Sequence, residues 1–158
     1  MSILGAVIVP HPPLIIPAVG RGLEQEVQTT IDAYRTVAKQ VAAWNPEVLI
    51  VTSPHQIMYA DYFHISPGRG ATGDMSAFGA AQTKLQVEYD EVLRDEIIRC
   101  GEAAGLQVGT LGQRDPYPDH GTFVPLYFLR EAGVDCPILR IGLSGFSPLD
   151  HYRLGQCI

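Results

Sequence analysis

The sequence predicts an α/β protein with parallel strands, and two patterns carry this prediction. The first is a pair of continuous apolar runs, Ile3–Val9 and Glu47–Thr52, which are typical of strands buried on both faces of a sheet. The second is the stretch Glu24–Trp44, where apolar residues recur at spacings of three and four, as on one face of an amphipathic helix. Strand, helix and strand in this order form a βαβ unit, normally parallel and right-handed. With 158 residues, we expect one domain over residues 1–158.

The other elements follow in chain order. Pro10–Gly20 is too rich in proline for regular structure, and Pro67–Ala81, rich in small residues, is expected to be a long surface loop. Further strands are expected at Tyr62–Ser66, Lys84–Glu88, Gln107–Leu111 and Pro137–Leu143, with a loop at Gly112–His120. Helices are expected at Asp90–Ala104, with Val92, Leu93, Ile97 and Ile98 inward, at Thr122–Ala132, and from Pro148 after an N-cap at Ser147. The last helix lacks an ending signal, so we expect the polypeptide to be a fragment of a longer protein.

Composition and charge narrow the class of protein. An apolar fraction of 46% indicates a globular chain, and a net charge of −6 argues against binding nucleic acid or anionic lipid. Cys100, Cys136 and Cys157 are scattered without a CxxC pair, which disfavours a structural zinc site and a disulfide framework. We expect buried thiols in a reducing cytoplasm. The N-terminal apolar run is too short for a secretory signal or a membrane span, so we expect a soluble, cytoplasmic protein.

Three of the five histidines follow strand-like runs or lie in loops where a strand would end: His11, His55 and His120. Imidazole is the commonest metal ligand and the commonest general acid or base near neutral pH. Because the carboxyl ends of neighbouring parallel strands meet at one edge of a sheet, His11 and His55 should converge on one ion. His120 stands between Asp119, which could orient it, and Gly121, which lets the backbone approach a ligand.

Each of these residues also has a structural interpretation. His11 could be a turn residue among prolines, and His120 could lie at a helix N-terminus beside a capping Asp119. His64 is expected to pack in or beside the sheet, and His151 to be solvated or stacked on the last helix. Loop carboxylates that could supply a further hard ligand are Asp61, Asp74, Asp115 and Asp119.

Three motifs together resemble those of a known family. They are Pro10-His11-Pro12-Pro13, Ser53-Pro54-His55, and the most specific, DHGTFVPL from Asp119 to Leu126. In order, spacing and position they are similar to motifs of the class III extradiol ring-cleavage dioxygenases of the LigB type, over the whole chain. The segment through His55–Asp61 looks closest to a prokaryotic subgroup associated with Memo-like proteins and radical-SAM partners.

The resemblance implies a three-layer α/β sandwich with a mostly parallel central sheet. It implies a non-haem Fe(II) site with His11 and His55 as ligands, acting on a catechol-type substrate with O₂. His120 would be the acid/base that takes a phenolic proton and later assists O–O cleavage. The family's third ligand is a glutamate, expected here beyond Ile158, and water or a carboxylate such as Asp61 could substitute for it.

Two other functions stay open from the sequence. One is a Memo-like metal-binding or scaffold module without ring-cleavage activity, and the other is a zinc-dependent hydrolase that uses the same histidines. The sequence does not specify an oligomeric state, and a homo-oligomer is compatible with it.

Overall fold

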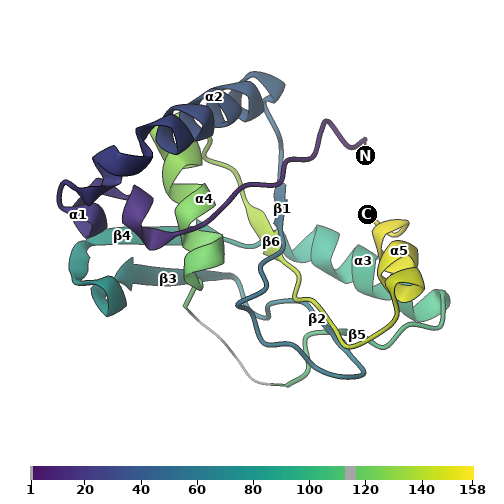
Figure 1. Ribbon diagram of the computed structural model, residues 1–158. Coiled ribbons are helices and arrows are strands. Elements are labelled where there is room, and N and C mark those ends of the chain that lie inside the picture. The colour runs from purple at the N-terminus through teal and green to yellow at the C-terminus, as the bar shows by residue number, and fades with distance from the viewer. Residues whose placement is uncertain (1, 113–116) are drawn as a thin grey trace. The chain divides into compact units, whose positions relative to one another are not determined.

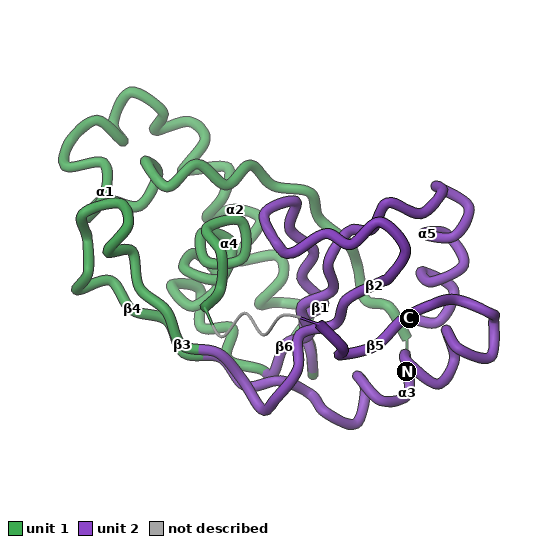
Figure 2. The backbone as a smooth tube through the Cα atoms, turned by 90° about the horizontal axis from the view of Figure 1, so that it is seen from below, with its two compact units in different colours: residues 1–47, 72–86, 117–136 green, residues 48–71, 87–116, 137–158 purple. Residues whose placement is uncertain are grey.

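The structure, a computed structural model, describes residues 2–112 and 117–158 (Figure 1). It confirms the α/β class, because helices alternate with strands that form small, mostly parallel sheets. The chain divides into two compact units between which it alternates (Figure 2). Unit 1 comprises Met1–Glu47, Thr72–Gln86 and Tyr117–Cys136, and unit 2 comprises Val48–Ala71, Val87–Pro116 and Pro137–Ile158. No helix in the described part of the chain is long and apolar enough to cross a membrane.

The elements have the following bounds. The α-helices are α1 (Pro17–Gly20), α2 (Gln28–Trp44), α3 (Glu91–Ala103), α4 (His120–Glu131) and α5 (Pro148–Gly155). Short 3₁₀ turns are η1 (Pro13–Ile15), η2 (Leu23–Val27) and η3 (Ser76–Phe78). The strands are β1 (Leu49–Val51), β2 (Phe63–His64), β3 (Gly70–Met75), β4 (Ala80–Glu88), β5 (Val108–Gly109) and β6 (Ile138–Arg140).

Unit 1 is organised around the packing of α2 against α4 (Figure 1). The predicted amphipathic helix is confirmed, since α2 buries Ile31, Tyr34, Ala38 and Val41 along one face. The ring centroid of Tyr34 lies 4.5 Å from that of Phe128 on α4, inside this contact. The helix packing therefore fixes α4, whose first residue is His120.

Unit 2 contains the parallel strand pairs. β1 pairs with β6, with Leu49 opposite Ile138, and β2 pairs with β5, with Phe63 opposite Val108. An antiparallel bridge between Ile65 and Ile141 links the two pairs. The core of this unit combines apolar side chains of the strands with those of α3 and α5: Phe63, Ile65, Leu93, Ile97, Leu106, Val108, Leu139, Ile141 and Leu154.

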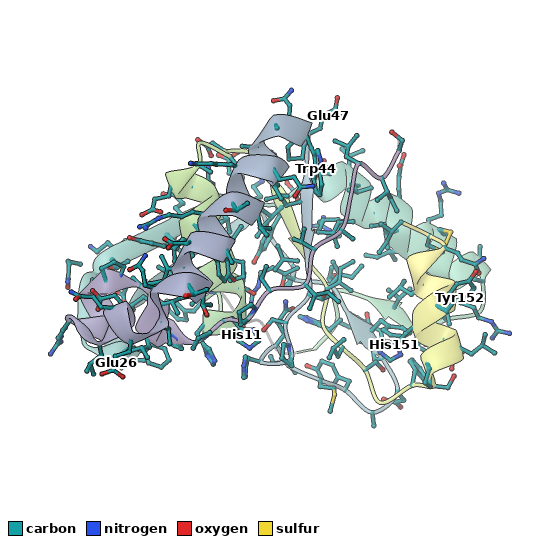
Figure 3. All side chains as sticks on the ribbon, turned by 45° about the horizontal axis from the view of Figure 1, so that its top comes forward. His11, Glu26, Trp44, Glu47, His151 and Tyr152 are labelled. Atoms are coloured by element: carbon teal, nitrogen blue, oxygen red, sulfur yellow. A yellow bond between two sulfur atoms is a disulfide. The ribbon has the colours of Figure 1, made fainter. Side chains whose placement is uncertain are left out.

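The prediction of a first strand at Ile3–Val9 is wrong. Among the described residues, the segment forms no strand and pairs with none, Ile8 is fully exposed, and the parallel partner of β1 is β6. The βαβ unit expected from residues 3–52 is therefore absent. A strand needs a hydrogen-bonding neighbour as well as apolar residues, and the local pattern does not specify the neighbour. Packing does hold the segment at Gly5, where a Cβ would overlap the ring of Trp44 at the end of α2 (Figure 3).

The prediction of a long loop at Pro67–Ala81 is also wrong. This stretch contains β3, the turn η3 and the start of β4, which pairs with β3. Small residues weaken the periodic pattern of this stretch, so the sequence does not show the strands. The chain turns back between β3 and β4 at Gly79, whose φ of 77° is one that glycine adopts without strain. On α3, Val92 was expected to point inward, yet it is 74% exposed, since its place on the helix lies off the buried stripe of Leu93 and Ile97.

The cysteines likewise differ from the prediction. Cys100 on α3 forms a disulfide with Cys157, which follows α5, and their Cα atoms are 5.6 Å apart. The two cysteines are 57 residues apart, so no local sequence pattern indicates that they pair. Cys136 is a free, partly buried thiol, and burial raises its pKa.

Candidate metal centre

His120 is held by the way in which α4 begins. Asp119 is the N-cap of this helix: its Oδ1 accepts the backbone N–H of Thr122 at 3.1 Å, and its Oδ2 accepts the Thr122 hydroxyl at 2.9 Å. The capping role of Asp119, which the sequence left open, is thus observed. His120 occupies the first turn of a helix that packs against α2, so its backbone position is well defined.

His11 reaches the site from an extended segment. Directly after it, the turn η1 is closed by the backbone N–H of Ile16, which donates to the carbonyl of Pro13 at 3.0 Å. Ile15 and Ile16 are completely buried and anchor this turn. The imidazole centroids of His11 and His120, both in unit 1, lie 5.8 Å apart, with 53° between the ring planes.

His55 belongs to unit 2 and lies in the turn after β1. Its backbone N–H donates to the hydroxyl oxygen of Ser53 at 3.2 Å, and the Gln56 N–H donates to the Ser53 carbonyl at 3.4 Å. Ser53 is buried, whereas the His55 side chain is exposed. The turn thus presents the imidazole outward from a fixed backbone.

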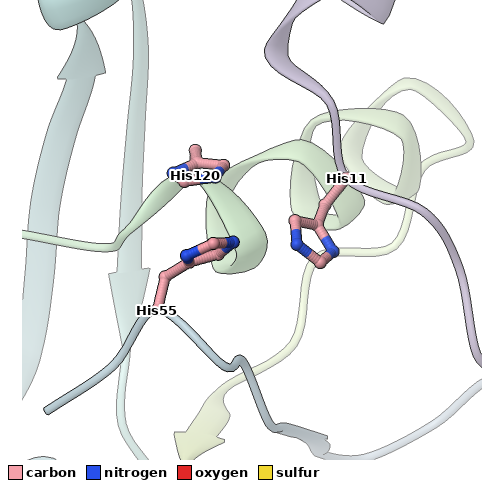
Figure 4. A group of neighbouring side chains, drawn as sticks. All are labelled: His11, His55 and His120. Carbon is pink, nitrogen blue, oxygen red and sulfur yellow. The ribbon is translucent and has the colours of Figure 1, made fainter.

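The three imidazoles form a group of potential metal ligands (Figure 4). Each offers a ring nitrogen, and these atoms lie within 4.8 Å of one another. A metal with bonds of about 2.1 Å holds adjacent ligand nitrogens about 3 Å apart. Imidazole suits iron and zinc alike, so this histidine triad could bind a metal, and the donor set alone does not select the ion.

The two remaining histidines have structural surroundings, as the sequence predicts. His64 is buried in β2, with its ring centroid 5.8 Å from that of Tyr59. His151 lies on α5 (Figure 3). It accepts the Ser144 N–H through Nε2 at 3.3 Å, and its ring meets that of Phe63 edge-on, with 4.8 Å between the centroids. Neither residue belongs to the group of potential metal ligands among the described residues.

The candidate loop carboxylates do not belong to the group of potential ligands among the described residues. Asp61 is exposed, and Asp115 lies outside the described residues. Asp74 accepts the Ser76 N–H at 2.8 Å, and its hydrogen bonds to Ser76 hold the pKa of its carboxyl below the ordinary value. The oxygens of Asp119 serve the start of α4, as described above.

One residue near His120 escaped sequence reasoning. Phe78, in η3, meets the His120 ring in a T-shaped arrangement with 5.6 Å between the centroids. The available signal was weak: Phe78 is the only aromatic residue in the small-residue stretch Pro67–Ala81.

The chain is an α/β protein with a histidine triad that could bind a metal, and its sequence identifies the family. The chain belongs to the family described as the catalytic LigB subunit of aromatic ring-opening dioxygenase, whose profile matches residues 5–158. The family supports a ring-cleavage dioxygenase type of protein, generally metal-dependent and acting on small molecules with O₂.

Protein CA_C1420 of Clostridium acetobutylicum is similar to this chain, with 29% identity over 163 residues, which cover 99% of the chain. The matched region is 35% of that relative, so the chain spans about a third of its length. The name of the relative states no activity.

Proposed function

We propose that this protein is a non-haem Fe(II)-dependent extradiol dioxygenase that opens a catechol-type ring with O₂. The observation that carries the proposal is the pairing of the His11 and His120 imidazoles in unit 1 of a LigB chain. The grouping of potential ligand nitrogens from His11, His55 and His120 supports a metal at the same place.

In this proposal His11 and His55 are metal ligands and His120 is the acid/base. Bound Fe(II) would supply a centre to which the substrate oxygens and O₂ can both coordinate and through which electrons pass. His120 takes a phenolic proton as the substrate binds and returns a proton during O–O cleavage. Both oxygen atoms enter the product as the C–C bond beside the hydroxyl-bearing carbons breaks, so the reaction needs no external reductant.

The position of His120 on α4 suits this role. Its backbone lies in the first turn of α4, where the N-cap Asp119 accepts the Thr122 N–H at 3.1 Å. The cap and the packing of α4 against α2 hold the backbone that carries the imidazole. The ring can therefore take a proton from the substrate with little rearrangement of the chain.

The third ligand of the family, a glutamate, has no counterpart in the motifs of this chain. We propose that water completes the coordination of Fe(II) bound to residues 1–158. Two protein ligands hold a metal less tightly than three, so we expect the isolated chain to bind Fe(II) weakly enough to require excess metal in the assay.

The test is oxygen consumption by the anaerobically Fe(II)-loaded protein over a panel of catechols. We expect equimolar use of O₂ and substrate and a yellow ring-opened product. His151→Ala is the matched control, because His151 already contacts Ser144 and Phe63, and it should retain Fe(II) binding.

The other outcomes would each reject the proposal. Metal binding without turnover of any catechol would favour a Memo-like binding or scaffold module. Hydrolysis that is supported by zinc and does not need O₂ would favour the hydrolase.

A further inference from the structure

An exposed phenylalanine lies beside the imidazole pair of unit 1. The Phe78 and His120 rings are T-shaped with centroids 5.6 Å apart, and the His120 ring also lies 5.8 Å from that of His11. Phe78 remains 40% exposed although it contacts His120. Its apolar surface is thus divided between the contact with His120 and solvent.

Phe78 lies in the turn between β3 and β4, which buried side chains and hydrogen bonds hold in place. The residues on either side of the turn, Met75 and Ala80, are buried. Asp74 accepts the Ser76 N–H at 2.8 Å at the start of η3. At its end, the guanidinium of Arg21 donates to the Gly79 carbonyl at 2.6 Å.

These contacts fix the backbone of Phe78 on both sides. The ring is therefore held next to His120 with little conformational freedom left to lose on binding. An aromatic side chain that is both fixed and partly exposed differs from an ordinary exposed apolar residue, which needs no explanation.

A site that binds an aromatic molecule combines apolar walls with a few polar groups that fix its orientation. The imidazoles supply the polar groups, and the exposed surface of Phe78 supplies the wall. A substrate ring could pack edge-to-face or offset against it, the arrangements that aromatic pairs prefer.

We propose that Phe78 is a positioning and specificity residue, which packs against the aromatic ring of the substrate beside His120. The proposal rests on the ring-cleavage function proposed above and assigns to the β3–β4 turn the recognition of the ring, as distinct from its two oxygens. The substrate class that follows is a catechol whose ring carries no bulky group on the side that meets Phe78.

The test separates ring packing from chemistry. Anaerobic titration of the Fe(II)-loaded protein with 4-nitrocatechol, followed by its absorbance, measures binding alone, and steady-state oxygen consumption measures KM and kcat. Phe78→Ala should weaken nitrocatechol binding and raise KM by about tenfold, the scale expected for loss of one aromatic packing contact, while kcat changes less than about threefold. Phe78→Tyr should restore both values, and Phe78→Leu should fall between them.

Two controls accompany these variants. Tyr152→Ala removes an exposed aromatic residue from α5 and should leave binding and KM unchanged (Figure 3). Circular dichroism and thermal unfolding confirm that each Phe78 variant is folded. Phe78→Leu, which keeps much of the apolar volume, serves if Phe78→Ala unfolds.

The outcomes distinguish this inference from the function on which it rests. Turnover of catechols with an unchanged KM in all Phe78 variants would overturn the role of Phe78 and leave the dioxygenase proposal intact. Nitrocatechol binding that weakens in Phe78→Ala, without turnover by the unmodified protein, would support the aromatic wall and reject the dioxygenase. Absence of both binding and turnover in the unmodified protein would overturn both.

Discussion

Replacing Asp119 by alanine should weaken α4 at the residue that carries the proposed proton transfer. The substitution removes the acceptor of the Thr122 N–H and of the Thr122 hydroxyl, which is completely buried. Loss of an N-cap costs about 0.5–2 kcal/mol, and a buried hydroxyl left without its acceptor costs about 1 kcal/mol more. We therefore expect Asp119→Ala to lower the free energy of unfolding by about 1.5–3 kcal/mol, or Tm by about 3–12 °C for a chain of this size.

The assay combines urea unfolding with catechol turnover. Fraying of the first turn displaces His120, so kcat should fall in Asp119→Ala while Fe(II) binding through His11 and His55 persists. Asp119→Asn keeps an oxygen acceptor and should recover most of the stability and turnover. Asp90→Ala is the matched control: it removes the N-cap of α3, whose Oδ1 accepts the Leu93 N–H at 2.9 Å, and should cost stability without lowering kcat. Equal losses of kcat in Asp119→Ala and Asp90→Ala would refute the link between the cap and His120.

Three further predictions follow from single residues. His120→Ala should keep Fe(II) bound but nearly abolish turnover, whereas His11→Ala should lose the metal; metal loss in both, measured by iron content, would make His120 a ligand instead. Ile8→Lys should change the free energy of unfolding in urea by less than about 0.5 kcal/mol, since the side chain is fully exposed. A loss of several kcal/mol would instead support a buried strand at Ile3–Val9. The buried hydroxyl of Tyr34 has no hydrogen-bond partner among the described residues, so Tyr34→Phe should raise stability by about 1 kcal/mol at pH 7. Burial also raises the pKa of Tyr34 above the ordinary 10.0, so the free energy of unfolding should decline as the pH rises past about 10 and the unfolded state ionises. Tyr34→Phe should remove that part of the decline. Identical free energies of unfolding for Tyr34→Phe and the unmodified protein from pH 7 to 11 would contradict both Tyr34 predictions.

The sequence predicted best what depends on neighbouring residues. The helical period of Gln28–Trp44 survives because its apolar stripe packs against α4, and Ser147 caps α5 by accepting the Asp150 N–H at 3.2 Å. The apolar runs around Ile50 and Leu139 each form a strand, β1 and β6. Each of these features is set by residues a few positions apart, together with burial of the resulting face.

The predictions failed where a distant partner decides the structure. Ile3–Val9 has the composition of a strand but no strand beside it, and no local pattern reveals that β1 pairs instead with a strand near residue 138. The Cys100–Cys157 disulfide and the contact of Phe78 with His120 likewise join segments far apart in the sequence. The histidines were singled out by their places after apolar runs and by motifs that resemble those of the family, although the βαβ geometry expected to align His11 with His55 is absent.

Each residue of the proposed site is held in place by its own neighbouring contacts, so substitutions at different residues should have different effects on catalysis. His120 depends on the cap at Asp119, His55 on the buried Ser53, and Phe78 on the contacts that fix the β3–β4 turn. Each support lies on a different stretch of chain, and distant substitutions without shared partners usually act additively. Loss of the cap should therefore lower kcat, loss of the Phe78 ring should raise KM, and loss of His11 should remove the metal. Asp119 and Phe78 are different, because both act on His120. A double variant should therefore be non-additive, and a double-mutant cycle on turnover measures the coupling through the T-shaped contact. Strict additivity would contradict a coupling of the turn to the helix.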